Sequence, residues 1–137
     1  MVDHLTPEKR SALMARIRSS DTVPEIKLRS ALHRRGWRFR KNVRKLPGTP
    51  DIVFPSRSIV IFVDGDFWHG YEFDNWSAKL PEFWRRKIAR NIERDGENNA
   101  ALRALGWSVL RVWEHQISKG LEQTILDIEL ALQVNAK

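Results

Sequence analysis

The chain has 137 residues, 42% of them hydrophobic, which is typical of one globular domain over residues 1–137 with a single buried core. Lys and Arg number 24 against 17 Asp and Glu, and the net charge of +7 favours nucleic acid as a partner over an anionic membrane surface or charge for solubility alone. The absence of cysteine excludes disulfides, thiolate zinc sites and thiol nucleophiles.

The first half of the chain predicts two helices followed by three strands. A cap at Thr6 opens a helix to about Arg18, and the capping box Thr22-Val23-Pro24-Glu25 opens a second helix that ends at Gly36. The three predicted strands are Trp37–Arg40, Asp51–Phe54 and Ser58–Asp64, with a turn at Pro55-Ser56-Arg57.

The second half predicts a loop, a long helix, a strand and a final helix. Residues 65–79 carry Gly, Asp, Asn and aromatic residues without a steady period, which indicates a functional loop. A helix then runs from near Pro81 to Gly106, a strand covers Trp107–Trp113, and a helix covers Leu121–Leu132. This order predicts an α/β fold, a mixed sheet flanked by helices.

Acidic residues stand at the ends of two predicted strands. Asp51 follows Pro50 at the mouth of one buried strand, and Asp64 ends the next. Neighbouring strand ends can bring carboxylate and backbone oxygens together, which suits a hard cation such as Mg²⁺ and the metal-assisted hydrolysis of a phosphodiester. A solvated acid in a turn is the simpler interpretation of Asp51 alone.

The segment Phe62-Val63-Asp64-Gly65-Asp66-Phe67-Trp68-His69 combines acids, large aromatics and an imidazole. His69 can act as a general base because an imidazole exchanges its proton near neutral pH. Phe67 and Trp68 can anchor the core, or in a basic protein they can wedge between base pairs.

Read together, a set of motifs resembles the very-short-patch repair endonucleases, abbreviated Vsr, from about Arg10 to Glu114. The motifs are Glu25, Leu46-Pro47-Gly48-Thr49-Pro50-Asp51, Phe67-Trp68-His69, Phe83-Trp84, Asn91, Arg94-Asp95, Gly106-Trp107 and Val112-Trp113-Glu114. The resemblance implies a restriction-endonuclease-like fold, and an enzyme that uses Mg²⁺, two ions per site, to nick double-stranded DNA beside a T:G mismatch. We therefore expect a cytoplasmic, nucleoid-associated protein of bacterial type, a monomer with DNA and other repair proteins as partners and no membrane association.

The resemblance also implies residue roles in catalysis. Asp51 becomes the bridging metal ligand, His69 activates the nucleophilic water, and Val63 adds its backbone carbonyl. Glu25 becomes an outer acid that holds water or orients His69, although its role as the capping partner of Thr22 explains it equally well.

Further residues match those that contact DNA in the family. Met14, Phe67 and Trp68 match the wedge, although a helix-face core residue is the simpler interpretation of Met14. Phe83, Lys87, Asn91 and Asp95 share one helix face, with Arg90 and Arg94 beside it. The resemblance assigns Lys87 and Asn91 to the mispaired bases; a solvated charged face is the alternative.

The chain departs from the family at two places. Typical members carry cysteines or histidine at Asp66, Tyr71, Phe73 and His115, so we expect no zinc, and packing by Tyr71, Phe73 and Trp76 in its place. They carry a histidine at Asp64; a carboxylate there can add a direct metal ligand and a catalytic group, or alter substrate choice.

Two other functions stay open from the sequence. One is a homing or restriction-associated nuclease that nicks unmismatched DNA on the same fold. The other is a DNA-binding module that has lost catalysis through the change at Asp64.

Overall fold

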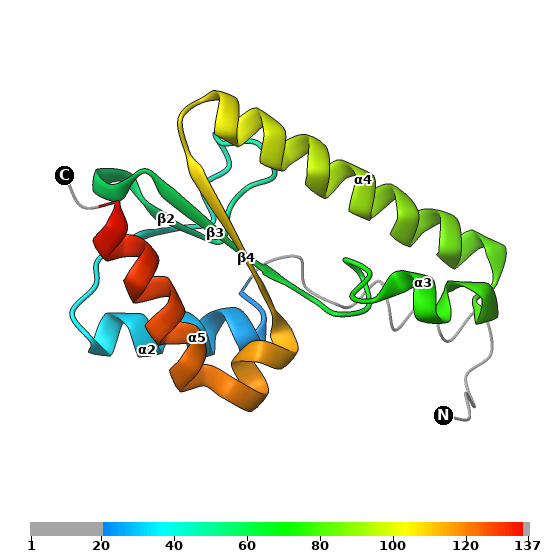
Figure 1. Cartoon of the computed structure of the whole chain (residues 1–137), viewed down its shortest axis with the longest axis horizontal. Helices are drawn as coiled ribbons and strands as arrows, with labels where there is room; N and C mark the ends of the chain where they lie inside the picture. The colour runs from blue at the N-terminus through cyan, green and yellow to red at the C-terminus, as the bar shows by residue number, and fades with distance from the viewer. Residues whose placement is uncertain (1–20, 136–137) are drawn as a thin grey trace.

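The computed structural model describes residues 21–135, where a four-stranded mixed sheet is flanked by helices (Figure 1). Its strands, adjacent in chain order, are β1 (Arg40–Lys41), β2 (Ile52–Phe54), β3 (Ile59–Asp64) and β4 (Ser108–Trp113). The pairs β1–β2 and β2–β3 are antiparallel, and β3–β4 is parallel. The predicted α/β class is confirmed. The helix predicted from Thr6, with Met14, lies outside the described residues.

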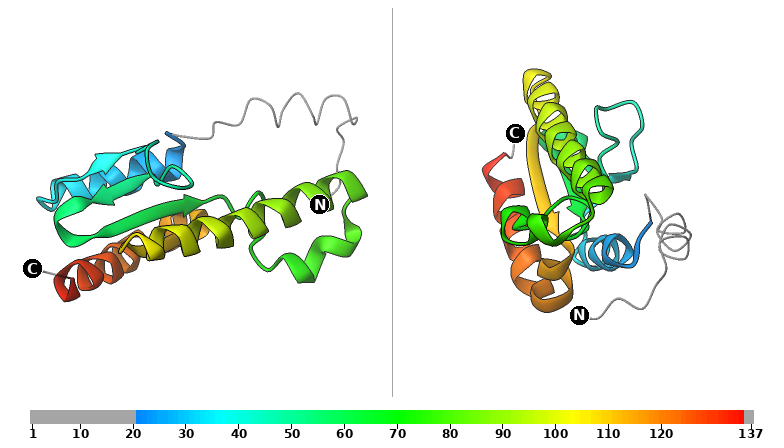
Figure 2. Two further views of the ribbon diagram at one scale, coloured as in Figure 1. Left: turned by 90° about the horizontal axis from the view of Figure 1, so that it is seen from above. Right: turned by 90° about the vertical axis from the view of Figure 1, so that its right-hand side faces the viewer.

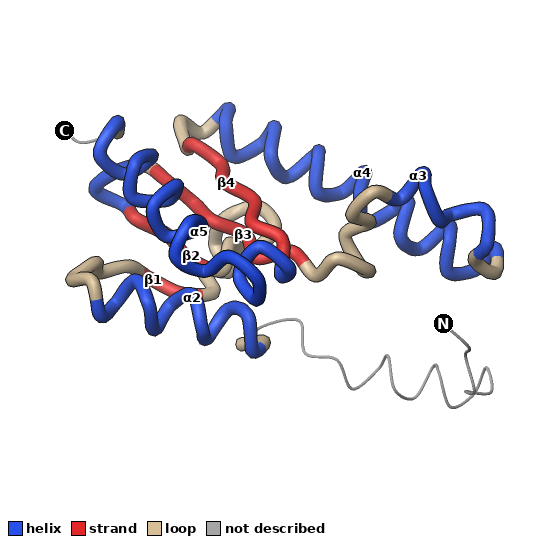
Figure 3. The backbone as a smooth tube through the Cα atoms, turned by 60° about the horizontal axis from the view of Figure 1, so that its bottom comes forward, coloured by secondary structure: helices blue, strands red, loops and turns tan. Residues whose placement is uncertain are grey.

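Two helices cover one face of the sheet. They are α2 (Val23–Arg34) and α5 (Glu114–Val134), which lie side by side in Figure 3. Leu28 and Leu32 of α2 pack with Ile128 of α5 in the larger core cluster. The predicted capping box starts α2, because the Glu25 carboxylate accepts a 2.7 Å hydrogen bond from the Thr22 amide.

The long helix α4 (Glu82–Ala104) covers the opposite face, as the end-on view of Figure 2 shows. Leu102 packs there with Val60 and Phe62 in a second, smaller core cluster. Because side chains alternate along a strand, β3 sends Ile59 and Ile61 to the α2/α5 face and its even-numbered residues to α4. The first half of α4 extends past the sheet beside the short helix α3 (Phe73–Trp76) (Figure 1).

Two predicted element boundaries and the predicted loop differ from the structure. The first strand is only Arg40–Lys41, because the Trp37 amide bonds to the Leu32 carbonyl and so still belongs to the end of α2. The last helix begins at Glu114 and is kinked at Gly120 rather than beginning at Leu121. Residues 65–79 include α3 and a 3-10 helix (Ser77–Lys79). Within the described part, no helix is both long and apolar enough to cross a membrane.

Candidate active site

Two buried carboxyl groups meet where α2 begins and β2 begins. Asp51 is 8% exposed, and its Oδ2 accepts a 2.7 Å hydrogen bond from the amide of Val63. Glu25, 2% exposed, faces Asp51 closely enough to share a hydrogen bond. Burial, this hydrogen bond and the neighbouring negative charges raise the pKa of Asp51 to about 9, against the favourable effect of the Val63 amide. Without a cation the pair therefore retains a proton at neutral pH.

This donor set fits a hard divalent cation. Carboxylate oxygens are the ligands that Mg²⁺ takes from proteins. Among residues 21–135, no Lys, Arg or His forms an ion pair with Glu25 or Asp51. Two buried acids that lack a basic partner and hold a proton between them are chemically suited to exchange that proton for a metal ion.

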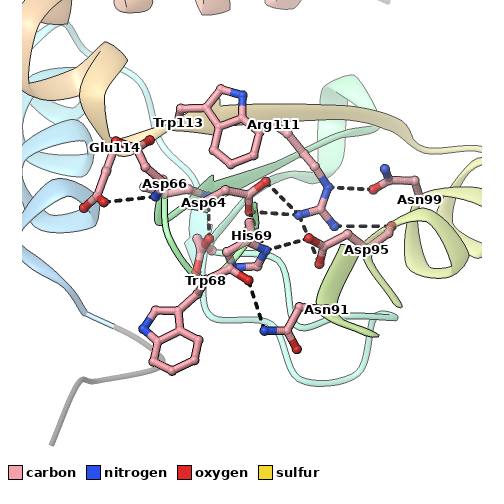
Figure 4. Close-up of polar contacts among 12 residues, drawn as sticks. Asp64, Asp66, Trp68, His69, Asn91, Asp95, Asn99, Arg111, Trp113 and Glu114 are labelled. Atoms are coloured by element: carbon pink, nitrogen blue, oxygen red, sulfur yellow. Dashed lines mark hydrogen bonds and ion pairs between the residues drawn. The ribbon is translucent and has the colours of Figure 1, made fainter. Parts of the chain in front are cut away.

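A second cluster lies on the α4 side of the same sheet end (Figure 4). The Nδ1 atom of His69 is 2.6 Å from Oδ2 of Asp95 in α4 and 3.6 Å from Oδ1 of Asp64 at the end of β3. Arg111 of β4 donates to both carboxylate oxygens of Asp64, at 2.8 and 3.1 Å. Asp64, His69 and Asp95 also form the one group of three acidic or histidine side chains within residues 21–135 whose ligand atoms all lie within 4.8 Å of one another.

The environment of His69 favours its protonated form. Burial of the ring lowers its pKa, but the hydrogen bond with Asp95 and the charges of Asp64 and Asp95 outweigh burial, so the pKa lies above its ordinary value of 6.5. Because Asp95 engages Nδ1, the Nε2 atom is left as the proton acceptor of the neutral ring. Burial raises the pKa of Asp64, while His69 and Arg111 oppose that rise.

A groove of about 770 Å³ opens over both clusters. It is lined by residues of α2, the loop before β2, the segment after β3, α4 and the start of α5, namely Thr22, Pro24, Glu25, Gly48, Thr49, Val63, Gly65, Phe67, Trp68, His69, Lys87, Asn91, Arg94, Asp95, Asn98 and Glu114. Asp51 is not among these lining residues, but it contacts two of them, Glu25 and Val63. The structure thus gathers most of the predicted catalytic and DNA-binding residues at one surface.

The predicted DNA-binding residues of α4 contact the segment that carries Trp68. The Lys87 ammonium lies 5.3 Å from the centre of the Trp68 ring, and the Asn91 side chain donates a 3.0 Å hydrogen bond to the Trp68 carbonyl. Phe67 stacks on Trp76 with a centroid distance of 5.6 Å. Arg94 lines the groove, whereas Arg90 is not among the lining residues; it is exposed and lies 3.5 Å from Glu93.

Polar and aromatic contacts join the residues that stand where typical Vsr-like sequences carry zinc ligands. Asp66 Oδ1 is 2.8 Å from His115 Nδ1, and the Tyr71 ring lies 4.3 Å from the His115 ring. The Asp66 amide also donates to Glu114 at 3.0 Å. Phe73 packs edge-on against Trp76 at 5.3 Å. These contacts join the segment after β3 to the start of α5.

Sequence reasoning missed the partner of His69 and the arginine behind it. Asp95 was placed on the correct helix face, but nothing local links it to a residue 26 positions away. Arg111 did leave a signal, since it is a charged residue inside a predicted strand between Leu110 and Val112. A charged side chain buried there requires a partner, and Asp64 was one of the two acids predicted at strand ends.

Comparison with known proteins places the chain in a family. The sequence profile described as DNA mismatch endonuclease Vsr matches residues 2–75. The type II nicking enzyme V.XorIIP of Xanthomonas oryzae is 48% identical over 120 residues, covering 86% of this chain and 88% of the relative. V.HpaIIP of Haemophilus parainfluenzae, also named a type II nicking enzyme, is 38% identical over 135 residues, or 96% of each chain.

The DNA mismatch endonuclease Vsr of Escherichia coli is 41% identical over 118 residues, covering 83% of this chain and 74% of the relative. The mixed sheet flanked by helices agrees with the restriction-endonuclease-like fold of these enzymes. By profile, by relatives and by architecture, this chain belongs to the Vsr endonuclease family.

Proposed function

We propose that this protein is a Mg²⁺-dependent endonuclease that nicks one strand of double-stranded DNA beside a T:G mismatch. The observation that carries the proposal is one groove lined by Glu25, which pairs with the buried Asp51, and by a histidine held by Asp95. Relatives named as a mismatch endonuclease and as nicking enzymes support the reaction class.

Asp51 and the Val63 carbonyl would hold the metal, with Glu25 as the adjacent acid, and the site would take two ions. The chemistry that a bound Mg²⁺ would supply is polarisation of the scissile phosphate and neutralisation of the charge that develops on the leaving oxygen. The neutral ring of His69 accepts the proton of the attacking water at Nε2, and Asp95 stabilises the ring once it is charged. Binding releases the proton that Asp51 holds in the metal-free protein.

The DNA-contacting part of the proposal involves the aromatic segment and α4. Phe67 and Trp68 enter the duplex beside the mismatch, and Lys87 and Asn91 contact the mispaired bases. Arg90 and Arg94 contact phosphates, which supply most of the affinity. We further propose that the protein acts as a cytoplasmic, nucleoid-associated monomer alongside other repair proteins.

A second candidate is a nicking enzyme that acts on unmismatched DNA. V.XorIIP and V.HpaIIP, which are named as type II nicking enzymes, support it. Both candidates use the same chemistry and differ only in the substrate.

The deciding experiment uses duplexes that carry one T:G mismatch in varied flanking sequences, with matched T:A and C:G duplexes as controls. Mismatch repair predicts a single-strand cut of the T:G duplex in Mg²⁺ that exceeds matched cleavage by at least about tenfold. Equal cleavage of matched duplexes selects the second candidate. Salt-sensitive binding of every duplex with no cleavage at all identifies an inactive binding module and refutes both.

A further inference from the structure

Arg111 lies on β4, the edge strand of the sheet, and its side chain is largely covered by α4. It belongs to β4, opposite Phe62 of β3, and its side chain is only 17% exposed. The guanidinium lies 4.1 Å from the centre of the Phe62 ring, and its Nε donates a 2.9 Å hydrogen bond to Asn99 of α4. The side chain is therefore held between its own strand, the Phe62 ring and Asn99 of α4.

The remaining nitrogens of Arg111 face two acids at the active site (Figure 4). One terminal nitrogen contacts both oxygens of Asp64 at 2.8 and 3.1 Å and lies 3.6 Å from Oδ1 of Asp95. The other is 3.5 Å from the Asp95 carbonyl. Asp95 in turn reaches His69 through its second oxygen. A continuous chain of contacts runs from Arg111 through Asp95 to the histidine.

The geometry points to Arg111 as a positioning residue, which holds Asp95 against His69 and takes Asp64 as its counter-ion, so that Asp64 serves this pair instead of binding metal. The inference rests on the proposed function, because it concerns the same histidine and the same acids. It revises the expected metal set to Asp51 and Val63, with Glu25 beside them.

Two physical arguments support this assignment. A cation bound directly by Asp64 would approach oxygens that already lie 2.8 and 3.1 Å from a guanidinium, so the two positive charges would compete. A buried arginine also adds little net stability compared with an apolar residue of similar size. What the arginine does supply is a planar group whose one terminal nitrogen contacts the Asp64 carboxylate and lies 3.6 Å from that of Asp95, while the other lies 3.5 Å from the Asp95 carbonyl.

Four variants test the inference: Arg111→Met, Arg111→Lys, Asp64→Asn and the double variant Asp64→Asn/Arg111→Met. Arg111→Met removes the guanidinium from the buried Asp64 and from Asp95, so it should lower kcat by about 10- to 100-fold with KM changed less than about threefold. Arg111→Lys keeps the positive charge, so its kcat should fall between those of the wild type and Arg111→Met. The double variant removes both charges, and its kcat should exceed that of Arg111→Met by at least about fivefold.

Arg35→Met is the matched control, since Arg35 also lies within ion-pair distance of two acids, Glu122 and Glu129, on the outer surface of α2 and α5. It should leave kcat unchanged. Thermal unfolding of each variant shows whether it is folded, and Arg111→Lys with the double variant keeps the test decisive if Arg111→Met does not fold.

Two readouts do not depend on cleavage. In metal-free protein, nitrogen NMR of His69 should show one tautomer, with the proton on Nδ1, in the wild type and in Arg35→Met, and a mixture in Arg111→Met. The Mg²⁺ affinity, measured by calorimetry, should stay within about threefold in Asp64→Asn but be lost in Asp51→Asn.

A Mg²⁺ affinity lost in Asp64→Asn, or a double variant no more active than Arg111→Met, would overturn the inference. An unchanged His69 tautomer and kcat in a less stable but folded Arg111→Met would also overturn it, by making the arginine structural only. Absence of cleavage by the wild type on every duplex refutes the proposed function instead, while the tautomer and Mg²⁺ readouts still decide the role of Arg111.

Discussion

Replacing Asp51 by asparagine should make the metal-free protein more stable while destroying its activity. The carboxyl group is buried against Glu25, and these surroundings raise its pKa from 3.8 to about 9. In the unfolded chain the group is ionised above about pH 4. Folding at neutral pH must therefore take up a proton, and the free energy of unfolding falls as the pH rises from about 4 to about 9.

The size of this effect follows from the pKa. Each pH unit above 3.8 corresponds to about 1.4 kcal/mol, so holding Asp51 protonated costs at most about 4 kcal/mol at pH 7 and about 1.5 kcal/mol at pH 5. An asparagine has no such cost, since it can accept from the Val63 amide and donate to Glu25 in the same place. A gain of this size at pH 7 raises the melting temperature by on the order of 10 °C.

Urea unfolding with EDTA at pH 5, 6, 7 and 8 measures the difference between Asp51→Asn and the wild type. The stability gain should grow with pH across this series. The control is Asp127→Asn, on the exposed side of α5, for which the gain should stay near zero at every pH. A variant that is less stable than the wild type throughout, or a difference that does not change with pH, would refute the reasoning.

Three other predictions follow from the same geometry. His69→Ala should lower kcat by about 10²- to 10⁴-fold and spare DNA affinity; lost affinity would make His69 a DNA contact. The kcat of the wild type should rise with pH, with the midpoint of the rise above pH 6.5, because the raised pKa of His69 keeps its ring protonated at lower pH. Mg²⁺ should raise the wild-type melting temperature more at pH 6 than at pH 5, since metal and proton compete, and should not raise that of Asp51→Asn; a pH-independent rise would place the ion elsewhere. Lys87→Ala and Asn91→Ala should reduce the preference for T:G over matched DNA more than total affinity, and an intact preference in both would remove α4 from mismatch recognition.

Local signals predicted most of the fold. The capping box at Thr22, the glycine at position 106 and the apolar runs of β2 and β3 all depend on neighbours in sequence, and each is present in the structure. The start of α5 was missed because Gly120 interrupts the helical pattern. Its backbone is indeed non-helical, and Thr124 stabilises the kink by donating to the carbonyls of Gln116 and Gly120.

In the site, too, the residues that belong to local motifs were predicted, and those that meet only through packing were not. Asp51, Glu25 and His69 were identified from motifs; in the structure Glu25 and His69 line one groove, and Asp51 contacts Glu25. Arg111 and Asp95 were not identified as a unit, because their meeting depends on the parallel pairing of β3 with β4 and on α4 crossing that face. Such contacts join positions up to 47 residues apart and are fixed only by packing.

We propose above that the protein cuts DNA at this groove with a metal ion held by Asp51. The most direct measurement is cleavage of a T:G duplex with a different label on each strand, comparing the wild type with Asp51→Asn at equal DNA occupancy, in Mg²⁺ and in EDTA. We expect one cut strand, only in Mg²⁺ and only with the wild type. Cleavage that persists in EDTA, or that Asp51→Asn performs at the wild-type rate, would contradict it.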